Sequence, residues 1–357
     1  MSPARSVALL LVISCVALAA VIGCQPKQPA SQGSGPTTGP TAGPTTPTPP
    51  TGAKGAAPGR QFVIGMSQCN LGEPWRVQMN ADIEAAAAQH PEIRLEMKDA
   101  QNKTETQQEQ VREFIQLGVD LIVISPKEAR PLTQPVAEAM DAGIPVIVLD
   151  RKIEGDKYTC FIGGDNVKIG EEAGKCMVKL LGGKGRIVEL KGLMTSTPAG
   201  ERHEGFMKGI KGSQIETIFD ADCKWLEEEA QKEMQSALSR FSGIDAVYGH
   251  NDPSAHGAYM AAKQEGKGRE KTIKFIGIDA LPHEGVRYVK EGYFAATLQY
   301  PTGGADAIEM ALKILSGETV EKSIVLGTRL FTPENVEQGG LEIPPGPLAG
   351  DQPAKSS

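Results

Sequence analysis

The sequence predicts an α/β protein with two doubly wound lobes, each built on a parallel β-sheet that helices cover on both faces. Two observations carry this prediction. From Phe62 onward, short apolar runs alternate with amphipathic stretches, and this strand–helix alternation is typical of such sheets. The alternation starts again after Asp165, and 357 residues are enough for two domains of ordinary size. We therefore expect two lobes that join directly at a tight turn over residues 163–166.

The first series supplies four strands with helices between them. Pro74 is favourable in the first turn of a helix, and Thr104 with Gln107 three residues later has the pattern of a capping box. Gly118 and Gly143 suit the ends of the next two helices. The predicted strands are residues 62–66, 93–97, 121–124 and 146–149.

The second series repeats this arrangement. A helix over residues 167–181 is expected to end at Gly182 and Gly183. The Pro/Gly-rich residues 339–357 are expected to form a loose tail. The predicted strands are residues 186–190, 215–219, 246–248 and 273–278, and the helices between them are residues 199–210, 226–241 and 253–264.

Polar and aromatic residues follow nearly every predicted strand. Ligands of open α/β sheets bind beyond the carboxyl ends of the strands, so two joined lobes place a cleft between two sets of strand ends. Asp150 and Arg151 follow the strand at 146–149 and offer acceptors beside a rigid set of donors. Read alone, this pair is equally compatible with a solvated surface contact. The candidate ligand-binding residues are Trp75, Arg76, Asp150, Arg151, Arg202, Trp225, Asn251, Asp279 and Gln299.

The two tryptophans indicate the kind of ligand. The chain has only Trp75 and Trp225, one in each predicted lobe and each just past a strand end. One indole on each wall of a cleft predicts a flat ligand with apolar C–H faces and polar edges, which describes a sugar ring. The expected acceptors of sugar hydroxyls are Asp150, Asp279 and Asn251, the expected donors are Arg76, Arg151 and Arg202, and Gln299 can do both.

Composition and motifs argue against other classes of protein. The formal net charge of −7 disfavours nucleic acid, which binds basic surfaces. The turn at residues 67–72 lacks the glycines of a dinucleotide site, and residues 182–185 lack the spacing of a P-loop. His250 and His256 are six residues apart, which is not a metal-binding pair on one helix face. We expect no catalytic residues, no cofactor and no metal, and hence no enzyme.

The N-terminus carries the signs of export. Residues 1–23 combine a basic start, an apolar run and small residues at its end, the pattern of a secretory signal peptide. Residues 21–24 resemble a bacterial lipobox, which implies lipid attachment to Cys24; an uncleaved anchor or an ordinary signal is the alternative. Residues 24–60, rich in Pro, Thr and Gly, predict an unstructured tether. We therefore expect a membrane-anchored lipoprotein of the periplasm or cell envelope, facing away from the cytoplasm.

Four further cysteines lie in the predicted lobes, at positions 69, 160, 176 and 223. An extracytoplasmic compartment permits disulfides, but four cysteines allow three pairings and the spacing selects none. Buried free thiols are the favoured interpretation.

Residues 61–335 resemble the periplasmic sugar-binding proteins of the ribose/galactose type, the type I solute receptors of ABC importers. The matching pieces, specific only as an ordered set, are residues 146–151, 164–166, 202–206, 250–252 and 277–279. The resemblance implies ligand roles for Asp150, Arg151, Arg202, Asn251 and Asp279. It also assigns the crossover glutamine of the family to Gln299, with Tyr300 as the alternative, and the second-lobe aromatic to Trp225 if two residues are inserted before it.

The resemblance also implies a three-segment hinge and a set of partners. The chain would cross between lobes near Asp165, at residues 299–301 and at residues 316–318. Lobe 1 would then comprise residues 61–165 and 301–316, and lobe 2 residues 166–300 and 317–338. A monomer that closes on a monosaccharide would present it to the transmembrane subunits of an ABC permease. Trp75-Arg76 replaces the two phenylalanines of the ribose-type pattern and is closer to the galactofuranose-binding branch.

Two other functions share this fold or this location. The regulatory core of lac-repressor-type transcription factors would need a helix-turn-helix before the lobes, where this chain has a signal and a tether. A sugar-sensing receptor for chemotaxis or for a sensor kinase is not excluded by the sequence, and it stays the alternative to transport.

Overall fold

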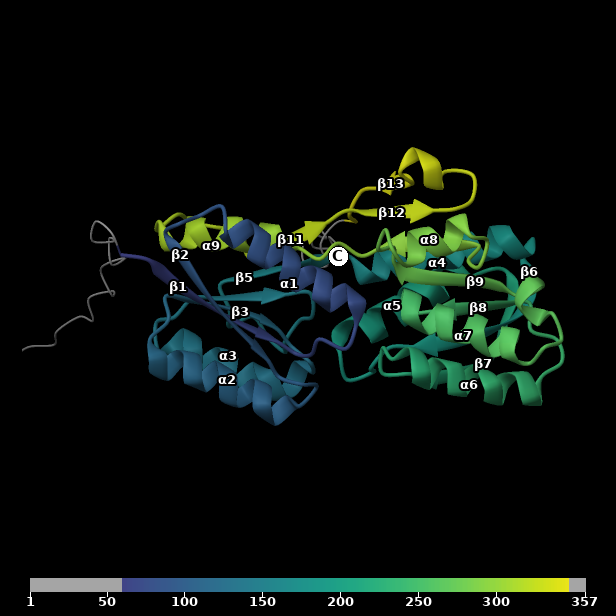
Figure 1. Cartoon of the computed structure of the whole chain (residues 1–357), viewed down its shortest axis with the longest axis horizontal. Coiled ribbons are helices and arrows are strands. Elements are labelled where there is room, and N and C mark those ends of the chain that lie inside the picture. The colour runs from purple at the N-terminus through teal and green to yellow at the C-terminus, as the bar shows by residue number, and fades with distance from the viewer. Residues whose placement is uncertain (1–59, 347–357) are drawn as a thin grey trace, which may run out of the picture. The chain divides into compact units, whose positions relative to one another are not determined.

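The computed structural model describes residues 60–346, which form two α/β lobes (Figure 1). The predicted signal peptide 1–23, Cys24, the tether up to residue 59 and the tail beyond residue 346 lie outside the described residues. Within residues 60–346, no helix is both long enough and apolar enough to cross a membrane.

The first lobe has a six-stranded sheet in which every pair of neighbours is parallel. The order of its strands is β11 (Ser323–Leu326), β5 (Cys160–Gly164), β4 (Val146–Leu149), β3 (Leu121–Ser125), β1 (Phe62–Gln68) and β2 (Ile93–Asp99). Helices α1 (Pro74–Ala87) and α9 (Gly304–Leu315) pack together on one face, and α2 (Thr104–Leu117) and α3 (Ala129–Asp141) on the other (Figure 1). Strands β3, β4 and β5 are buried throughout, as central parallel strands are.

The second lobe has a seven-stranded sheet. The order of its strands is β13 (Leu341–Ile343), β12 (Thr328–Phe331), β10 (Ala296–Gln299), β9 (Lys274–Asp279), β8 (Ala246–Gly249), β6 (Lys184–Lys191) and β7 (Gln214–Asp222). Only β12 and β13 run antiparallel to their neighbours. The helices are α4 (Asn166–Leu181), α5 (Thr197–Gly209), α6 (Glu227–Arg240), α7 (Asp252–Gln264) and α8 (Gly285–Lys290), with short 3-10 turns at Arg269–Lys271 and Val336–Gln338.

Helices α4 and α5 pack unusually close together, and both carry residues of the site described below. Glycines on the two helices make this possible. A Cβ atom at Gly205 would lie 2.0 Å from the carbonyl oxygen of Val167, and one at Gly170 would lie 2.3 Å from that of Arg202. The position of α5 over its sheet therefore depends on the absence of side chains at this contact.

The eight predicted strands are present, but the structure corrects several details. Strand β5, over Cys160–Gly164, is not among the predicted strands, and its last two residues belong to the predicted turn at 163–166. Glycine is required at position 163 because a Cβ atom there would lie 2.7 Å from the ring of Phe161, and this glycine interrupts the apolar pattern of the strand. The capping box is also wrong: Lys103 is the N-cap of α2, and the Thr104 hydroxyl donates to Glu128 instead. The side-chain amide of Gln107 donates to the carbonyl oxygen of Ser125, at 2.9 Å.

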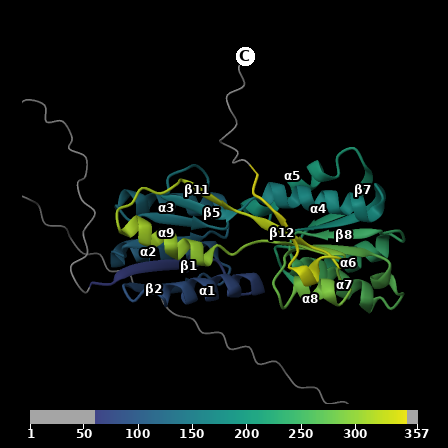
Figure 2. The same cartoon turned by 90° about the horizontal axis from the view of Figure 1, so that it is seen from above.

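The chain crosses between the lobes three times, and the third crossing is later than expected. The first follows β5, where Asp165 caps α4, and the second follows β10. Residues 317–326, which we assigned to the second lobe, lead into β11, and this strand pairs with β5 of the first sheet. The third crossing is therefore at Gly327, between β11 and β12, as Figure 2 shows in yellow.

The expected loose tail is also partly ordered. Residues Leu341–Ile343 form β13 and pair with β12 at the edge of the second sheet. Gly339 and Gly340 have positive φ angles of 85° and 79°, which allow the turn that leads into this strand. Three residues are too few to produce a strand pattern that sequence alone reveals.

Candidate ligand-binding site

A small pocket lies between the two lobes, at the carboxyl ends of their strands. Eight of the nine predicted binding residues line it, and each is less than 10% exposed. The lining residues are Glu73, Trp75, Arg76, Asp150, Arg151, Pro198, Arg202, Trp225, Asn251, Asp279 and Tyr300. The two indoles predicted to share a cavity therefore do share one.

Gln299 is the predicted residue that does not line the pocket, and Tyr300 takes its place. Gln299 is the last residue of β10 and pairs with Asp279 of β9. Successive side chains of an extended chain point to opposite sides, so only one of the neighbours 299 and 300 can face the pocket. The structure therefore places Gln299 outside the pocket lining, whereas the alternative, Tyr300, is part of it.

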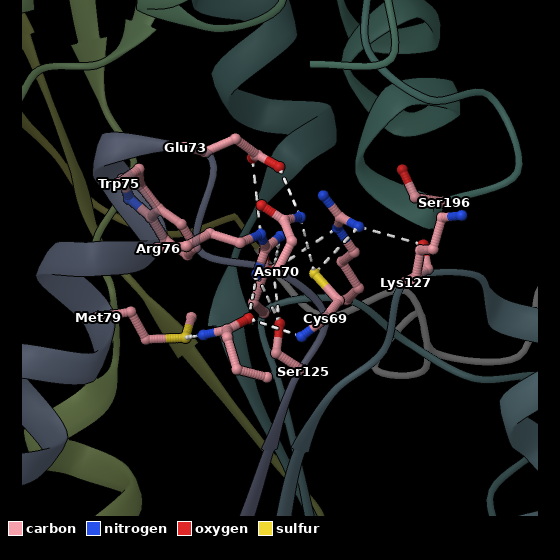
Figure 3. A network of polar contacts seen from close by, with 12 residues as sticks. Cys69, Asn70, Glu73, Trp75, Arg76, Met79, Ser125, Lys127 and Ser196 are labelled. Atoms are coloured by element: carbon pink, nitrogen blue, oxygen red, sulfur yellow. Dashed lines mark hydrogen bonds and ion pairs between the residues drawn. The ribbon is translucent and has the colours of Figure 1, made fainter. Parts of the chain in front are cut away.

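The first lobe contributes a network centred on the guanidinium of Arg76 (Figure 3). Its Nη2 donates to Oδ2 of Asp150 at 2.9 Å, and its Nη1 donates to Oε1 of Gln68 at 3.0 Å and to Oγ of Ser125 at 2.8 Å. Burial raises the pKa of the Asp150 carboxyl, but the charges of Arg76 and Arg151 outweigh it and hold the pKa below its usual value. Arg76 thus mainly fixes the ionised Asp150 in place.

Tyr300 connects the first wall of the pocket to the second. Its hydroxyl donates to Oδ1 of Asp150 at 3.0 Å and accepts from Nδ2 of Asn166 at 3.4 Å. Its carbonyl oxygen accepts from the indole nitrogen of Trp75 at 2.7 Å, and the two rings lie 5.1 Å apart. The guanidinium of Arg202 lies 4.5 Å from the centre of the Tyr300 ring. Because Tyr300 lies on the second crossing, these contacts link both lobes to the hinge.

The second lobe contributes Arg202, Trp225 and Asn251. Nε of Arg202 donates to Oδ1 of Asn166 at 2.9 Å, and its guanidinium lies 5.2 Å from the ring centre of Trp225. Arg151 of the first lobe lies 5.5 Å from the same ring. Among the described residues, the indole nitrogen of Trp225 and Nε of Arg151 are buried donors with no acceptor.

The predicted role of Asn251 as an acceptor does not fit its surroundings. Asn251 is the N-cap of α7, and its Oδ1 accepts from both the backbone nitrogen and the hydroxyl of Ser254. Its Nδ2 donates to the carbonyl oxygen of Trp225 at 3.0 Å. The side chain therefore has one N–H left for a ligand and no free lone pair, because the helix start uses the oxygen.

Asp279 differs from Asp150 in its chemistry. Its carboxylate makes no hydrogen bond to the residues that the structure describes. Burial raises the pKa of Asp279 well above its usual value; the charge of Arg202 opposes the rise, and Asp252 and Glu284 add to it. The pocket therefore holds one ionised carboxylate in a tight network and one unpartnered carboxyl that burial pushes towards its neutral form.

Strained backbone is concentrated at this pocket. Asp150, Trp225 and Asp279 have φ angles of 70°, 71° and 132°, and the adjacent Lys224 and Ala280 also have positive φ. Such conformations cost about 1–3 kcal/mol each in non-glycine residues and occur where the surroundings hold them in place, commonly at functional sites. Their position here supports a functional reading of the pocket.

Comparison with known proteins identifies the family. A family model described as periplasmic binding protein domain matches residues 64–319. The chain belongs to this family. The predicted ribose/galactose type, the type I fold and the prediction of a binding protein rather than an enzyme are thereby confirmed.

Three relatives show how far the similarity extends. The ribose import binding protein of Bacillus subtilis is 31% identical over 80% of this chain and 92% of its own length. The galactofuranose-binding protein of Escherichia coli is 31% identical over 78% of this chain and 90% of its own length. The structure of the fructose-binding periplasmic domain of a hybrid two-component system is 43% identical, with a TM-score of 0.75, over 78% of this chain and 93% of that domain.

The remaining sequence predictions have mixed outcomes. All four cysteines of the lobes are buried and free, as favoured. No group of three metal-ligating side chains gathers anywhere in residues 60–346. Glu73 and Pro198 also line the pocket, and they are not among the nine predicted binding residues. Each of them directly precedes a residue at which the sequence predicts a helix to begin, Pro74 and Ala199. This position before a helix was the available signal in the sequence.

Proposed function

We propose that this protein binds a monosaccharide between its lobes and delivers it to an ABC importer. The observation that carries the proposal is a buried pocket to which both lobes contribute charged and aromatic side chains at their strand ends. A ligand that contacts both walls favours the closed arrangement of the lobes over an open one. The importer would then recognise the closed form, in which both lobes hold one fixed relation.

The lining of the pocket fits a small polyhydroxylated ligand. The unpartnered carboxyl of Asp279 is suited to a hydroxyl group, and the free N–H groups of Trp225 and Asn251 are suited to oxygen acceptors. The three relatives bind ribose, galactofuranose and fructose by name, which supports the same class of ligand here.

We further propose that the protein works as a monomeric lipoprotein. Lipid on Cys24 would hold it at a membrane, and residues 25–60 would let the lobes move above the surface. Metabolic labelling with a palmitate analogue tests the anchor: wild-type protein is expected to carry the label, and the Cys24→Ser variant is not.

Sugar sensing is the second candidate function. The 43% identical relative is the periplasmic domain of a hybrid two-component system, so this fold also serves signalling. Deletion of the gene separates the two functions. Transport predicts a loss of sugar uptake, whereas sensing predicts intact uptake with a lost transcriptional or chemotactic response to the sugar.

Binding itself is tested by titration calorimetry with the chain from residue 24 onward carrying Cys24→Ser. The panel contains ribose, fructose, galactose, arabinose and myo-inositol. We expect micromolar or tighter binding of at least one member, equivalent to about −8 kcal/mol. The Asp279→Ala variant is the control and is expected to weaken that binding. Absence of heat across pentoses, hexoses and polyols would contradict the proposal.

A further inference from the structure

A buried carboxylate lies directly behind the second wall of the pocket. Glu189 of β6 is 1% exposed and accepts hydrogen bonds from two histidines. Nδ1 of His203 lies 2.8 Å from its Oε1, and Nε2 of His250 lies 2.9 Å from the same oxygen. None of these three residues lines the pocket.

Each histidine is the neighbour of a pocket residue. His203 follows Arg202 on α5, and His250 precedes Asn251 at the start of α7. The carbonyl oxygen of His250 also accepts a hydrogen bond from Nη1 of Arg202. One carboxylate on β6 therefore holds together the two segments that carry Arg202 and Asn251.

The network is electrostatically strong. Burial alone would raise the pKa of Glu189, but the hydrogen bonds from His203 and His250 outweigh it and lower the pKa to about 2. Glu189 is therefore ionised, and a buried carboxylate keeps its donors in a fixed geometry because the loss of either one is costly. The hydrogen bond to Glu189 is also the main reason why the pKa of the partly exposed His203 is raised.

We propose that Glu189 is a positioning residue for ligand binding: it sets the placement of Arg202 and Asn251 through His203 and His250. This inference rests on the proposed binding of a sugar in the pocket. Glu189 does not touch the ligand in this proposal. It determines instead where the guanidinium of Arg202 and the amide of Asn251 lie relative to Trp225. The guanidinium of Arg202 lies over the indole ring, and the amide of Asn251 donates to the carbonyl oxygen of Trp225.

The lobe offers a matched control for this proposal. Glu227 also accepts a hydrogen bond from a histidine, His256, at 2.8 Å, but neither residue lines the pocket or adjoins Arg202 or Asn251. The variants Glu189→Gln and Glu227→Gln therefore make the same chemical change at two glutamate–histidine contacts of the same lobe. If Glu189 positions the second wall of the pocket, only Glu189→Gln is expected to change ligand binding.

The first measurement is ligand affinity, on the sugar that binds the wild-type chain most tightly in the calorimetric panel. Glu189→Gln is expected to weaken binding by about 10-fold or more, as the loss of hydrogen bonds to a charged group would. Glu227→Gln is expected to stay within about 2-fold. Equal affinity of Glu189→Gln and the wild type would overturn the proposal.

The second measurement needs no ligand. The chain has two tryptophans, so a ¹⁵N-labelled sample gives two indole N–H signals, which Trp75→Phe assigns. Glu189→Gln is expected to move the signal of Trp225 and to leave that of Trp75 in place. An unmoved Trp225 signal would overturn the positioning role of Glu189, whether or not a sugar binds. Absence of sugar binding to the wild type would instead contradict the proposed function.

A second pair of variants covers the case in which Glu189→Gln does not fold. His250→Gln keeps a donor for Glu189, whereas His250→Ala removes it. Rescue by the conservative variant is expected, with affinity within about 3-fold of wild type for His250→Gln and a loss of about 10-fold or more for His250→Ala. Equal affinities of the two would show that the contact with Glu189 does not matter for binding.

Discussion

Replacement of Tyr300 by phenylalanine tests which residue of the second crossing serves the pocket. The change removes one oxygen atom and keeps the ring, so the stacking with Trp75 and Arg202 is retained. The hydrogen bonds of the hydroxyl to Asp150, at 3.0 Å, and to Asn166, at 3.4 Å, are lost. The matched control is Gln299→Ala, which removes the neighbouring side chain outside the pocket.

The expected size of the effect follows from the charge on Asp150. A hydrogen bond to a charged group contributes about 1.5–3 kcal/mol. Because the Tyr300 hydroxyl orients the carboxylate that we propose as a ligand acceptor, its loss is expected to weaken sugar binding by about 10- to 150-fold. Gln299→Ala leaves the backbone oxygen that accepts from Thr328 in place, so a change below about 3-fold is expected.

Titration calorimetry of both variants with the best sugar of the panel measures these affinities, and thermal unfolding without ligand checks that both variants fold. If Tyr300→Phe binds like the wild type while Gln299→Ala loses affinity, Gln299 is the binding residue and the reasoning from strand alternation fails.

Three further predictions concern stability and closure. Burial and the charge of Asp252 raise the pKa of Glu284 from 4.5 to about 7, so the ionisation of Glu284 destabilises the fold as pH rises through that interval. The variant Glu284→Gln is therefore expected to raise the free energy of unfolding by up to about 3 kcal/mol at pH 8 and to leave it unchanged at pH 4.5, as measured by denaturant unfolding. A Cβ atom at Gly205 would lie 2.0 Å from a carbonyl oxygen of α4, so Gly205→Ala is expected to lower the free energy of unfolding by about 1–3 kcal/mol in the same assay. The control is Gly200→Ala, which is expected to cause no loss because no atom lies within 4 Å of a Cβ placed there. The ion pair between Lys152 and Glu201 joins the lobes at 2.7 Å but is exposed, so Lys152→Ala should weaken sugar binding by only about 2- to 5-fold, and a larger loss would show a direct role.

The sheets could be predicted from the sequence because a fully buried strand with an unbroken apolar run leaves a clear pattern. The run Val146–Leu149 is apolar at every position and lies in the middle of the first sheet. Strand β5 has only Cys160, Phe161 and Ile162 before two glycines, and close packing requires Gly163. Strand β5 contains a glycine that its neighbours in space require, and such a strand cannot be recognised from the local sequence pattern alone.

The site could be predicted as a set of residues but not as a set of roles. Strand ends converge in this fold, so Asp150, Trp225 and Asp279 were found by their place after strands. Their hydrogen-bond partners come from distant parts of the chain and leave no local trace. The use of the Asn251 oxygen by Ser254 and the network behind Arg202 therefore emerged only from the three-dimensional arrangement.

The contacts between the lobes bear on how tightly any ligand binds. Outside the hinge, the backbone nitrogen of Lys152 donates to the hydroxyl of Thr197 at 3.0 Å, and the backbone nitrogen of Ala129 donates to the carbonyl oxygen of Thr195 at 3.3 Å. Arg151 stacks on Trp225 across the cleft. These bonds stabilise closure by themselves, and apparent affinity rises in proportion to the fraction of protein already in the competent form. The contacts of Ala129 and Lys152 with the second lobe are thus expected to contribute to affinity, although neither residue lines the pocket.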